Sequence, residues 1–185
     1  MNVYLIRHAE TAWSLTGQHT GVTDLPLTVN GENQARALAP RLQVLDLKHV
    51  LVSPRQRASQ TCALAGLGAV AVVEPDLSEW IYGDFEGLRS VDIRKENPSW
   101  NIWQDGCPGG ESPAEVSARA DRLISRVRNL QGSVALFSHG QFGAAFVARW
   151  VGLALIEGQH FVLRPASICM LGYDANHPDR PTLEW

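Results

Sequence analysis

This chain of 185 residues is organised around VYLIRHAET, residues Val3 to Thr11. Four apolar residues, two of them β-branched, open the stretch and predict a short buried strand. Arg7 and His8 follow at once, at the carboxyl end of that strand. Ligands of open α/β sheets bind at this edge, where a nucleophile or base beside a fixed positive charge suits an anionic substrate. The pair is equally typical of a strand end that meets water, so the rest of the chain has to decide.

Composition and charge exclude several classes of protein. The chain is 45% apolar and 19% charged, which predicts a globular protein, and its length predicts a single domain over residues 1–185. The net charge of −3 gives no reason to expect nucleic acid or an anionic membrane as partner. No signal peptide and no membrane helix are expected, so we predict a cytoplasmic protein. Any anion site must therefore be local.

Cysteines and histidines give no sign of a metal or a disulfide framework. Cys62, Cys107 and Cys169 are widely spaced and form no C-x-x-C pair, so reduced, buried thiols are expected. The remaining histidines lack metal-ligand spacing, and no metal or cofactor is predicted. The sequence PGGE at residues 108–111 lacks the lysine and glycine spacing of a Walker motif and is interpreted as a turn.

Strands and helices alternate along the chain. Thr28 can cap a helix that reaches about Asp46, with a kink or an early end at Pro40. Pro54 fits the first turn of a later helix, and Ser112 opens another with capping-box spacing. We predict strands over 49–53, 70–73 and 133–138, a helix over about 140–151, one or two strands over 161–173 and a polar surface tail. This order predicts a three-layer α/β/α sandwich with a mostly parallel central sheet.

Residues 74–111 break this regular pattern. Aromatic residues are crowded there among glycine, aspartate and proline, namely Trp80, Tyr82, Phe85, Trp100 and Trp103. Such a segment forms either a cap over a pocket or a packed cluster under a long loop. We call residues 74–111 the cap region.

Basic residues follow three of the predicted strands. Arg7 with His8, Arg55 with Arg57, and His139 each stand just after a strand. Because the carboxyl ends of parallel strands meet at one edge of a sheet, these groups are expected to converge there. Their convergence would supply the local positive site that the net charge does not.

The motifs resemble those of the histidine phosphatase superfamily, also called phosphoglycerate-mutase-like, over nearly the whole chain. The resemblance is carried by residues 7–11 (RHAET), 17–28 (GQHTGVTDLPLT), 53–61 (SPRQRASQT), 77–87 (LSEWIYGDFEG) and 138–140 (SHG). It implies that His8 becomes phosphohistidine, that Arg7 and Arg57 clamp the phosphoryl oxygens, and that His139 completes the pocket. A planar guanidinium can bind phosphate oxygens bidentately and stays charged, which suits this task.

The resemblance also assigns a proton donor and several binding residues. Glu79 lies in the Leu-x-Glu segment that implies the general acid and base, because the leaving alkoxide needs a proton and water later needs a base. Glu86 is expected to hold its turn and Glu10 to order the loop after His8. Accessory binding residues implied by the motif positions are Arg55, Ser14, Thr20, Gly21 and Gly140.

Departures from the mutase pattern favour a phosphatase. Mutases usually carry asparagine and arginine where this chain has Ser14 and Gln18. Because Gln18 replaces the arginine, a cation near the pocket is lost, which argues against a bisphosphoglycerate cofactor. The motifs are most similar to the branch that contains sedoheptulose-1,7-bisphosphatase. We therefore predict a phosphatase for small phosphate esters such as sugar phosphates or bisphosphates, and a homodimer surface at a late strand edge near 161–173. A mutase of the same family and an inactive phospho-ligand-binding module are the alternatives.

Overall fold

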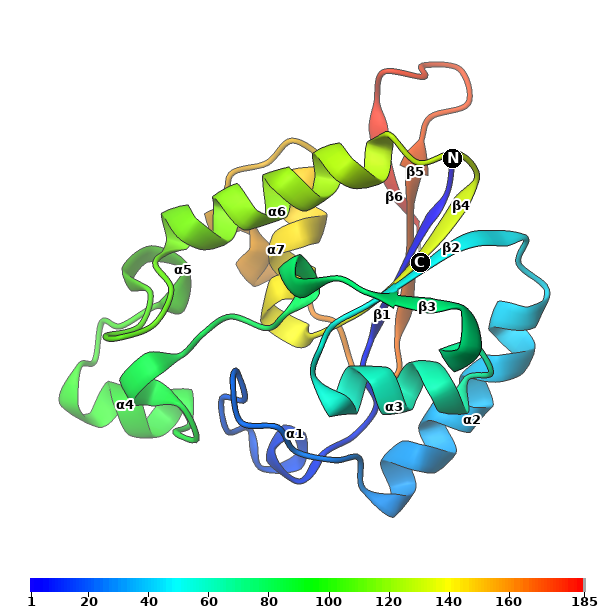
Figure 1. Cartoon of the computed structure of the whole chain (residues 1–185). Helices are drawn as coiled ribbons and strands as arrows, with labels where there is room; N and C mark the ends of the chain where they lie inside the picture. Colours follow the sequence, from blue (N-terminus) through cyan, green and yellow to red (C-terminus); the bar gives the residue numbers. More distant parts are fainter. Residues whose placement is uncertain (185) are drawn as a thin grey trace.

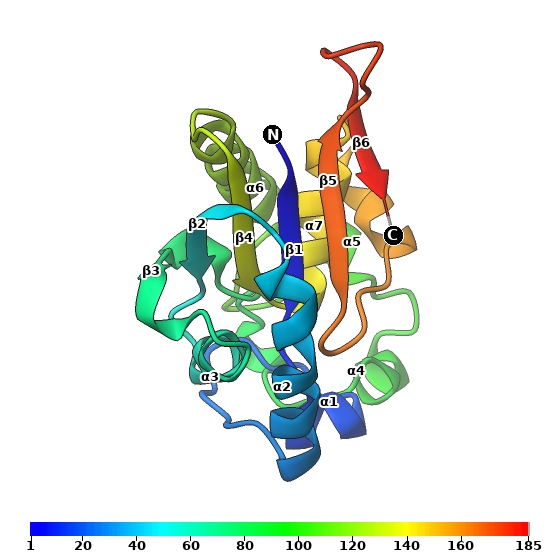
Figure 2. The same ribbon diagram turned by 90° about the vertical axis from the view of Figure 1, so that its right-hand side faces the viewer.

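A six-stranded sheet forms the centre of the computed structural model, which describes residues 1–184. Its strands are β1 (Val3–Arg7), β2 (Leu47–Val52), β3 (Ala71–Val73), β4 (Ser133–Ser138), β5 (Ile168–Tyr173) and β6 (Pro181–Glu184). They lie in the order β3-β2-β4-β1-β5-β6, and Figure 2 shows them side by side. The first four strands are parallel, whereas β5 pairs antiparallel with both β1 and β6. The predicted mostly parallel α/β fold is confirmed.

Helices cover both faces of the sheet, as predicted. Figure 1 shows α2 (Val29–Gln43) and α3 (Gln56–Leu64) on one side, and α6 (Pro113–Arg128) and α7 (Gly140–Trp150) on the other. Successive strand residues face opposite layers. In β4, Ala135 and Phe137 pack in the cluster with α2 and α3, whereas Val134 and Leu136 pack in the cluster with α6 and α7. The strand is therefore apolar on both faces.

Strand register brings three strand ends to one level. Arg7 of β1 lies opposite Ser138 of β4, and Val52 of β2 lies opposite Phe137. The ladder continues one residue further, because the amide of His8 donates to the Ser138 carbonyl at 2.9 Å and the amide of Ser53 donates to the Phe137 carbonyl at 3.0 Å. The residues that follow β2, β4 and β1 are thus neighbours at the carboxyl edge.

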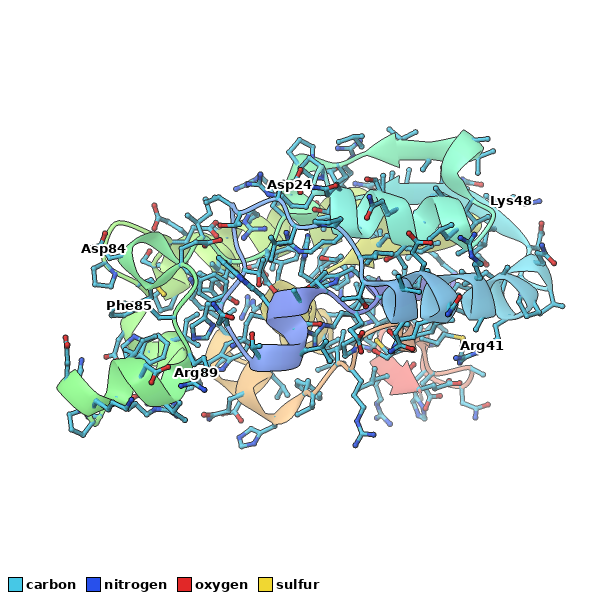
Figure 3. The ribbon with its side chains drawn as sticks, turned by 90° about the horizontal axis from the view of Figure 1, so that it is seen from below. Asp24, Arg41, Lys48, Asp84, Phe85 and Arg89 are labelled. Atoms are coloured by element: carbon cyan, nitrogen blue, oxygen red, sulfur yellow. The ribbon has the colours of Figure 1, made fainter. Side chains whose placement is uncertain are left out.

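Short helices and loops cover this edge. They comprise α1 (Ala12–Thr16), α4 (Ser90–Glu96), α5 (Ile102–Asp105) and the 3₁₀ turns η2 (Pro75–Leu77), η3 (Gly83–Phe85) and η4 (Leu155–His160). The 3₁₀ turn η1 (Gly68–Val70) precedes the parallel strand β3 and therefore lies at the opposite edge. Figure 3 views this end of the molecule, with Asp84, Phe85 and Arg89 of the cap region on the side away from Arg41 and Lys48. The aromatic residues Trp80, Tyr82, Trp100 and Trp103 of the cap region are buried and belong to the core cluster of α6 and α7.

Some predicted boundaries were wrong. Helix α3 begins at Gln56 rather than at Pro54, because Arg55 keeps an extended conformation (φ −77°, ψ 135°) and serves as the N-cap. The strand predicted from Val70 begins at Ala71 after a 3₁₀ turn. Helix α2 continues through Pro40 and ends at Gln43. Pro40 is exposed, so water can satisfy the carbonyl that lacks an amide partner.

The carboxyl-terminal part differs most from the prediction. Of residues 161–173, only Ile168–Tyr173 forms a strand, and β5 is paired on both sides. The expected strand edge is therefore not free there, since the outer strands of the sheet are β3 and β6. The homodimer stays a prediction, but without this location. Strand β6 lies in the tail that was expected to be polar surface. Within residues 1–184, no helix has the length and apolar character needed to cross a membrane.

Candidate active site

A cavity of about 350 Å³ opens at the carboxyl edge of the sheet. It lies beside the end of β1, the start of α7, and the loops around α1 and η4. Six of the residues predicted from the sequence line it, namely Arg7, His8, Ser14, Thr20, Glu79 and Gly140. Its remaining walls are formed by Trp13, Gly17, Gln18, His19, Tyr82, Trp103, Gln141, Gly158, Gln159, Phe161, Val162 and Leu163.

His8 is buried, and its ring is held in one tautomer. Its Nδ1 lies 2.7 Å from the Ala9 carbonyl oxygen, which can only accept, so Nδ1 carries the proton. Burial, and then the guanidinium groups of Arg7 and Arg57, hold the pKa of His8 well below its ordinary value of 6.5. The ring is therefore neutral at pH 7, with the lone pair on Nε2.

His139 lies beside His8, as the strand register requires. The two ring centroids are 5.2 Å apart. Nε of Arg57 donates to Nδ1 of His139 at 3.2 Å, so the proton of the neutral ring is on Nε2, which donates to Oγ of Ser53 at 2.7 Å. Burial, followed by Arg57 and His8, lowers the pKa of His139 well below 6.5. The chain thus brings two neutral imidazoles together beside fixed cations.

Arg7 supplies a guanidinium to the cavity wall. Its Nη1 donates to the Leu163 carbonyl at 2.6 Å, while within residues 1–184 its buried Nε has no hydrogen-bond partner. Gly140 allows this close placement, since a Cβ there would lie 3.2 Å from Cζ of Arg7. A buried donor that the protein leaves unpaired, next to a cavity, is suited to an anion.

Glu79 is buried at the amino end of α7. Its Oε1 accepts from the amides of Trp80 at 2.8 Å and Phe142 at 2.7 Å, and its Oε2 accepts from the amide of Gln141 at 3.0 Å. Three backbone donors therefore fix the carboxyl group in the cavity wall. Oε2 takes only one of these bonds, so it has room for a further proton or hydrogen bond.

Four predicted residues do not line the cavity: Arg55, Arg57, Gly21 and His139. The guanidinium of Arg57 binds the loop at residues 20–23, which comes earlier in the chain. Besides the bond to His139, it donates to the carbonyls of Thr20, Gly21 and Thr23 at 2.8 to 3.1 Å. Arg55 is half-buried, and its Nε has no partner among residues 1–184.

The smaller predicted binding residues are engaged in the loops themselves. Oγ of Ser14 accepts from the Thr11 amide in a capping box, and its hydroxyl donates to the Thr11 carbonyl. The hydroxyl of Thr20 donates to the Gln18 carbonyl. Glu86 accepts from the amides of Gly21 and Thr23, so it ties the cap region to this loop rather than holding its own turn alone.

Glu10 does order the loop after His8. It accepts from Thr28 Oγ1 at 2.6 Å and Asn30 Nδ2 at 2.9 Å, which joins the loop to the start of α2. At the same loop, Thr61 holds Ala9, because its hydroxyl oxygen accepts from the Ala9 amide at 3.0 Å. This expectation from the sequence is confirmed by the contacts.

Sequence reasoning missed His19 as a wall residue. Its ring stacks on Tyr82 with centroids 4.5 Å apart, and Nε2 lies 3.2 Å from Oγ of Ser90. Burial lowers the pKa of His19 to about 4. The position of His19 in the sequence does not predict this role, because its partners Tyr82 and Ser90 both come from the distant cap region. Across the cavity, Gly158 fits against Trp103, where a Cβ would come within 2.4 Å of the ring.

Across residues 1–184, no three His, Cys, Asp or Glu side chains are grouped so that they could hold a metal ion. The three cysteines are buried and separate, and burial raises the pKa of each thiol to about 12.

A neutral imidazole with an open ring nitrogen, placed beside a fixed guanidinium and a buried carboxyl group, suits transfer of a phosphoryl group. The fold and the site together define an α/β enzyme that acts on phosphate esters. A model of the histidine phosphatase superfamily (branch 1) matches residues 3–184. This chain belongs to that superfamily and is one of its phosphatases.

Known relatives agree with this membership. The chain is 44% identical to an acid phosphatase of Mycobacterium tuberculosis, over 92% of this chain and 85% of that protein. It is 36% identical to sedoheptulose 1,7-bisphosphatase of Saccharomyces cerevisiae, over 82% and 68%. A solved structure of an open reading frame of Mycobacterium tuberculosis is similar with a TM-score of 0.92 and 40% identity, covering 100% of this chain and 95% of that one.

Proposed function

We propose that this phosphatase hydrolyses small phosphate monoesters through a phosphohistidine intermediate on His8. The observation that carries the proposal is the state of His8. Its buried ring is neutral, its Nδ1 proton is fixed by the Ala9 carbonyl, its Nε2 has no hydrogen-bond partner among residues 1–184, and Arg7 lies in the same cavity. A neutral nitrogen can attack phosphorus without first losing a proton. Arg7 and Arg57 serve as the cations for the phosphoryl oxygens, with Arg55 as an accessory, and His139 lies beside the nucleophile.

The first step forms a bond from Nε2 of His8 to phosphorus and breaks the ester P–O bond. The leaving oxygen takes a proton from the carboxyl group of Glu79, which becomes a carboxylate held by three backbone amides. The phosphorylated ring keeps its proton on Nδ1, so it carries a positive charge that the phosphoryl group balances. No metal or cofactor has a part in this scheme.

The second step consumes water. Glu79 takes a proton from water while the water oxygen bonds to phosphorus and the P–Nε2 bond breaks. Inorganic phosphate leaves, and both Glu79 and the neutral His8 return to their starting states. A single carboxyl group thus serves as acid and then as base.

The leaving-group side of the cavity favours an uncharged polar alcohol such as a sugar. Trp13, Gln18, Trp103 and Gln159 supply aromatic and amide surface there, and of the residues 1–184 that line the cavity, only Arg7 brings a guanidinium. The amide of Gln18 is already bound to the Gly87 carbonyl at 2.9 Å. Because Arg7 and Arg57 are both assigned to the reacting phosphoryl group, no arginine of the cavity wall within residues 1–184 is left for a second phosphate, which supports hydrolysis over a mutase that uses a bisphosphate cofactor.

A test of this function measures inorganic phosphate released from glycerol phosphate, sugar monophosphates and sugar bisphosphates without added bisphosphoglycerate. We expect turnover in the native enzyme and a loss of at least about 10³-fold in His8→Ala, because neither arginine replaces the nucleophile. Isomerisation of phosphoglycerate that depends on bisphosphoglycerate would show a mutase instead. No turnover on the whole panel would favour a phospho-ligand-binding module.

A further inference from the structure

An ion pair between Arg119 and Glu111, which does not line the cavity, binds the backbone around Glu79. Arg119 lies on α6 with only 8% of its surface exposed. Its guanidinium pairs with Glu111 in two parallel bonds, Nε to Oε1 at 2.9 Å and Nη2 to Oε2 at 2.8 Å. The pair is nearly buried, so breaking it leaves an uncompensated charge.

The remaining donors of Arg119 bind the segment that carries Glu79. Nη1 donates to the carbonyls of Asp76 at 2.9 Å and Ser78 at 2.7 Å, and Nη2 reaches the carbonyl of Glu79 at 3.4 Å. The carbonyl between them, that of Leu77, accepts from Oγ of Ser138 at 2.8 Å. Four consecutive carbonyls are thus held by two side chains, and every N–H of the guanidinium is used.

Glu111 fixes the residues on the other side of Glu79. Its Oε2 accepts from the amide of Ile81 at 2.9 Å, its own amide donates to the Ile81 carbonyl at 2.9 Å, and its carbonyl accepts from Nε1 of Trp80 at 2.9 Å. The segment from Asp76 to Ile81 is therefore attached at both ends to one ion pair.

Arg119 also reaches the helix end that binds the carboxyl group. Its Cζ lies 4.2 Å from the centre of the Phe142 ring, and the amide of Phe142 donates to Oε1 of Glu79. One guanidinium thus contacts both the backbone of Glu79 and the residue that holds its side chain. An ion pair that only joined two parts of the surface would contact neither the Glu79 backbone nor Phe142.

We propose that Arg119 and Glu111 are positioning residues that set the Glu79 carboxyl group against the leaving oxygen. The inference rests on the proposed role of Glu79 as general acid. Catalysis by a positioned acid is worth about 10² to 10⁴ in rate and is lost steeply with small displacements. Lysine at position 119 would keep the charge but lose the planar fork, so it cannot hold Glu111 and three carbonyls together.

The test compares Arg119→Lys with the native enzyme on p-nitrophenyl phosphate and on glycerol phosphate. The nitrophenolate leaves without a proton, whereas the glycerol alkoxide needs one. Both esters give the same phosphoenzyme, so kcat/KM isolates the first step. We expect kcat/KM to fall at least about 10-fold for glycerol phosphate and less than about 3-fold for the aryl ester. Arg122→Lys is the matched control, since Arg122 lies on the same helix and pairs with the Asp76 carboxylate at the surface.

Glu79→Gln separates this inference from the function beneath it. If Glu79→Gln shows the leaving-group dependence and Arg119→Lys adds nothing in that background, Arg119 acts through Glu79. Two results would refute the positioning role while the proposed function stands, given that Glu79→Gln shows the leaving-group dependence. In the first, Arg119→Lys lowers kcat/KM equally for both esters. In the second, Arg119→Lys adds its full effect in the double variant. If Glu79→Gln itself slows both esters equally, the general-acid role and this inference both fail. Should Arg119→Lys not fold, Glu111→Gln carries the same comparison, with the same outcomes.

Discussion

His19 makes the stability of this protein sensitive to acid, and the replacement His19→Phe tests it. The ring is buried in the cavity wall, stacked on Tyr82 and directed at Trp100 edge to face, with a hydroxyl partner in Ser90. Burial lowers its pKa from 6.5 to about 4. Phenylalanine keeps the aromatic packing and removes the titration.

The sign follows from which state binds the proton first. As pH falls below 6.5, the unfolded chain protonates its histidine while the folded chain does not, so the free energy of unfolding decreases until the folded pKa is reached. The contribution is fully present above pH 6.5. For a shift from 6.5 to about 4, the loss is about 2 kcal/mol at pH 5 and approaches about 3 kcal/mol below pH 4. Against a typical stability of about 5 to 15 kcal/mol this is large.

The assay is urea unfolding followed by tryptophan fluorescence at about pH 7.5 and about pH 5, at one ionic strength. His8 and His139 act in the same direction, so the native protein loses more than the share of His19. The loss between the two pH values should be about 2 kcal/mol smaller in His19→Phe than in the native protein. His160→Gln, at an exposed position, is the control and should follow the native protein. Equal losses in His19→Phe and the native protein would refute a buried neutral His19.

Two further predictions follow from single contacts, and a third follows from the burial of the cysteines. Thr61→Val removes the hydroxyl that accepts from the Ala9 amide and donates to the Arg57 carbonyl, so chemical denaturation should show a loss of about 1 to 3 kcal/mol; a neutral result would mean that Ala9 finds another partner. Gly158→Ala places a Cβ 2.4 Å from the Trp103 ring, so the ring must move in the cavity wall. Steady-state kinetics with p-nitrophenyl phosphate should show a changed KM and a nearly unchanged kcat, and an unchanged KM would show that these residues do not contact the substrate. Iodoacetamide at about pH 8 should label none of the three cysteines in the folded protein and all of them in urea, because burial raises their pKa values to about 12; mass spectrometry counts the adducts.

The central strands could be predicted because their signal is local. Residues 133–138 and 3–6 are short apolar runs that end at polar residues, and both are strands in the structure. The convergence of His8 and His139 follows from the same signal, since equal strand directions put their carboxyl ends together. What the sequence could not supply is the register. Only the pairing of Arg7 with Ser138 makes the two histidines direct neighbours.

The elements that the prediction missed depend on distant partners. Strand β6 has four residues, begins with proline and exists because β5 pairs with it. Helices α4 and α5, of seven and four residues, are too short to persist without tertiary packing. The orientation of Arg57 likewise depends on three carbonyls of the loop at residues 20–23, more than 30 positions away in the chain. No local pattern encodes such contacts.

The two halves of the cavity therefore differ in what fixes them. The proposed phosphoryl end rests on strand ends in register, so a shift of one residue in β1 against β4 would separate His8 from His139 and turn one of them to the other face. The opposite end is built by loops, with Trp13 and Gln18 near α1 and Gly158 and Gln159 in η4. Loops accept substitution more readily than a paired strand does. Substitutions in those loops should thus alter which ester binds, through KM, while the leaving-group dependence that we propose for Glu79 persists. Substitutions at Arg119 should change the leaving-group dependence while the choice of ester that binds stays the same.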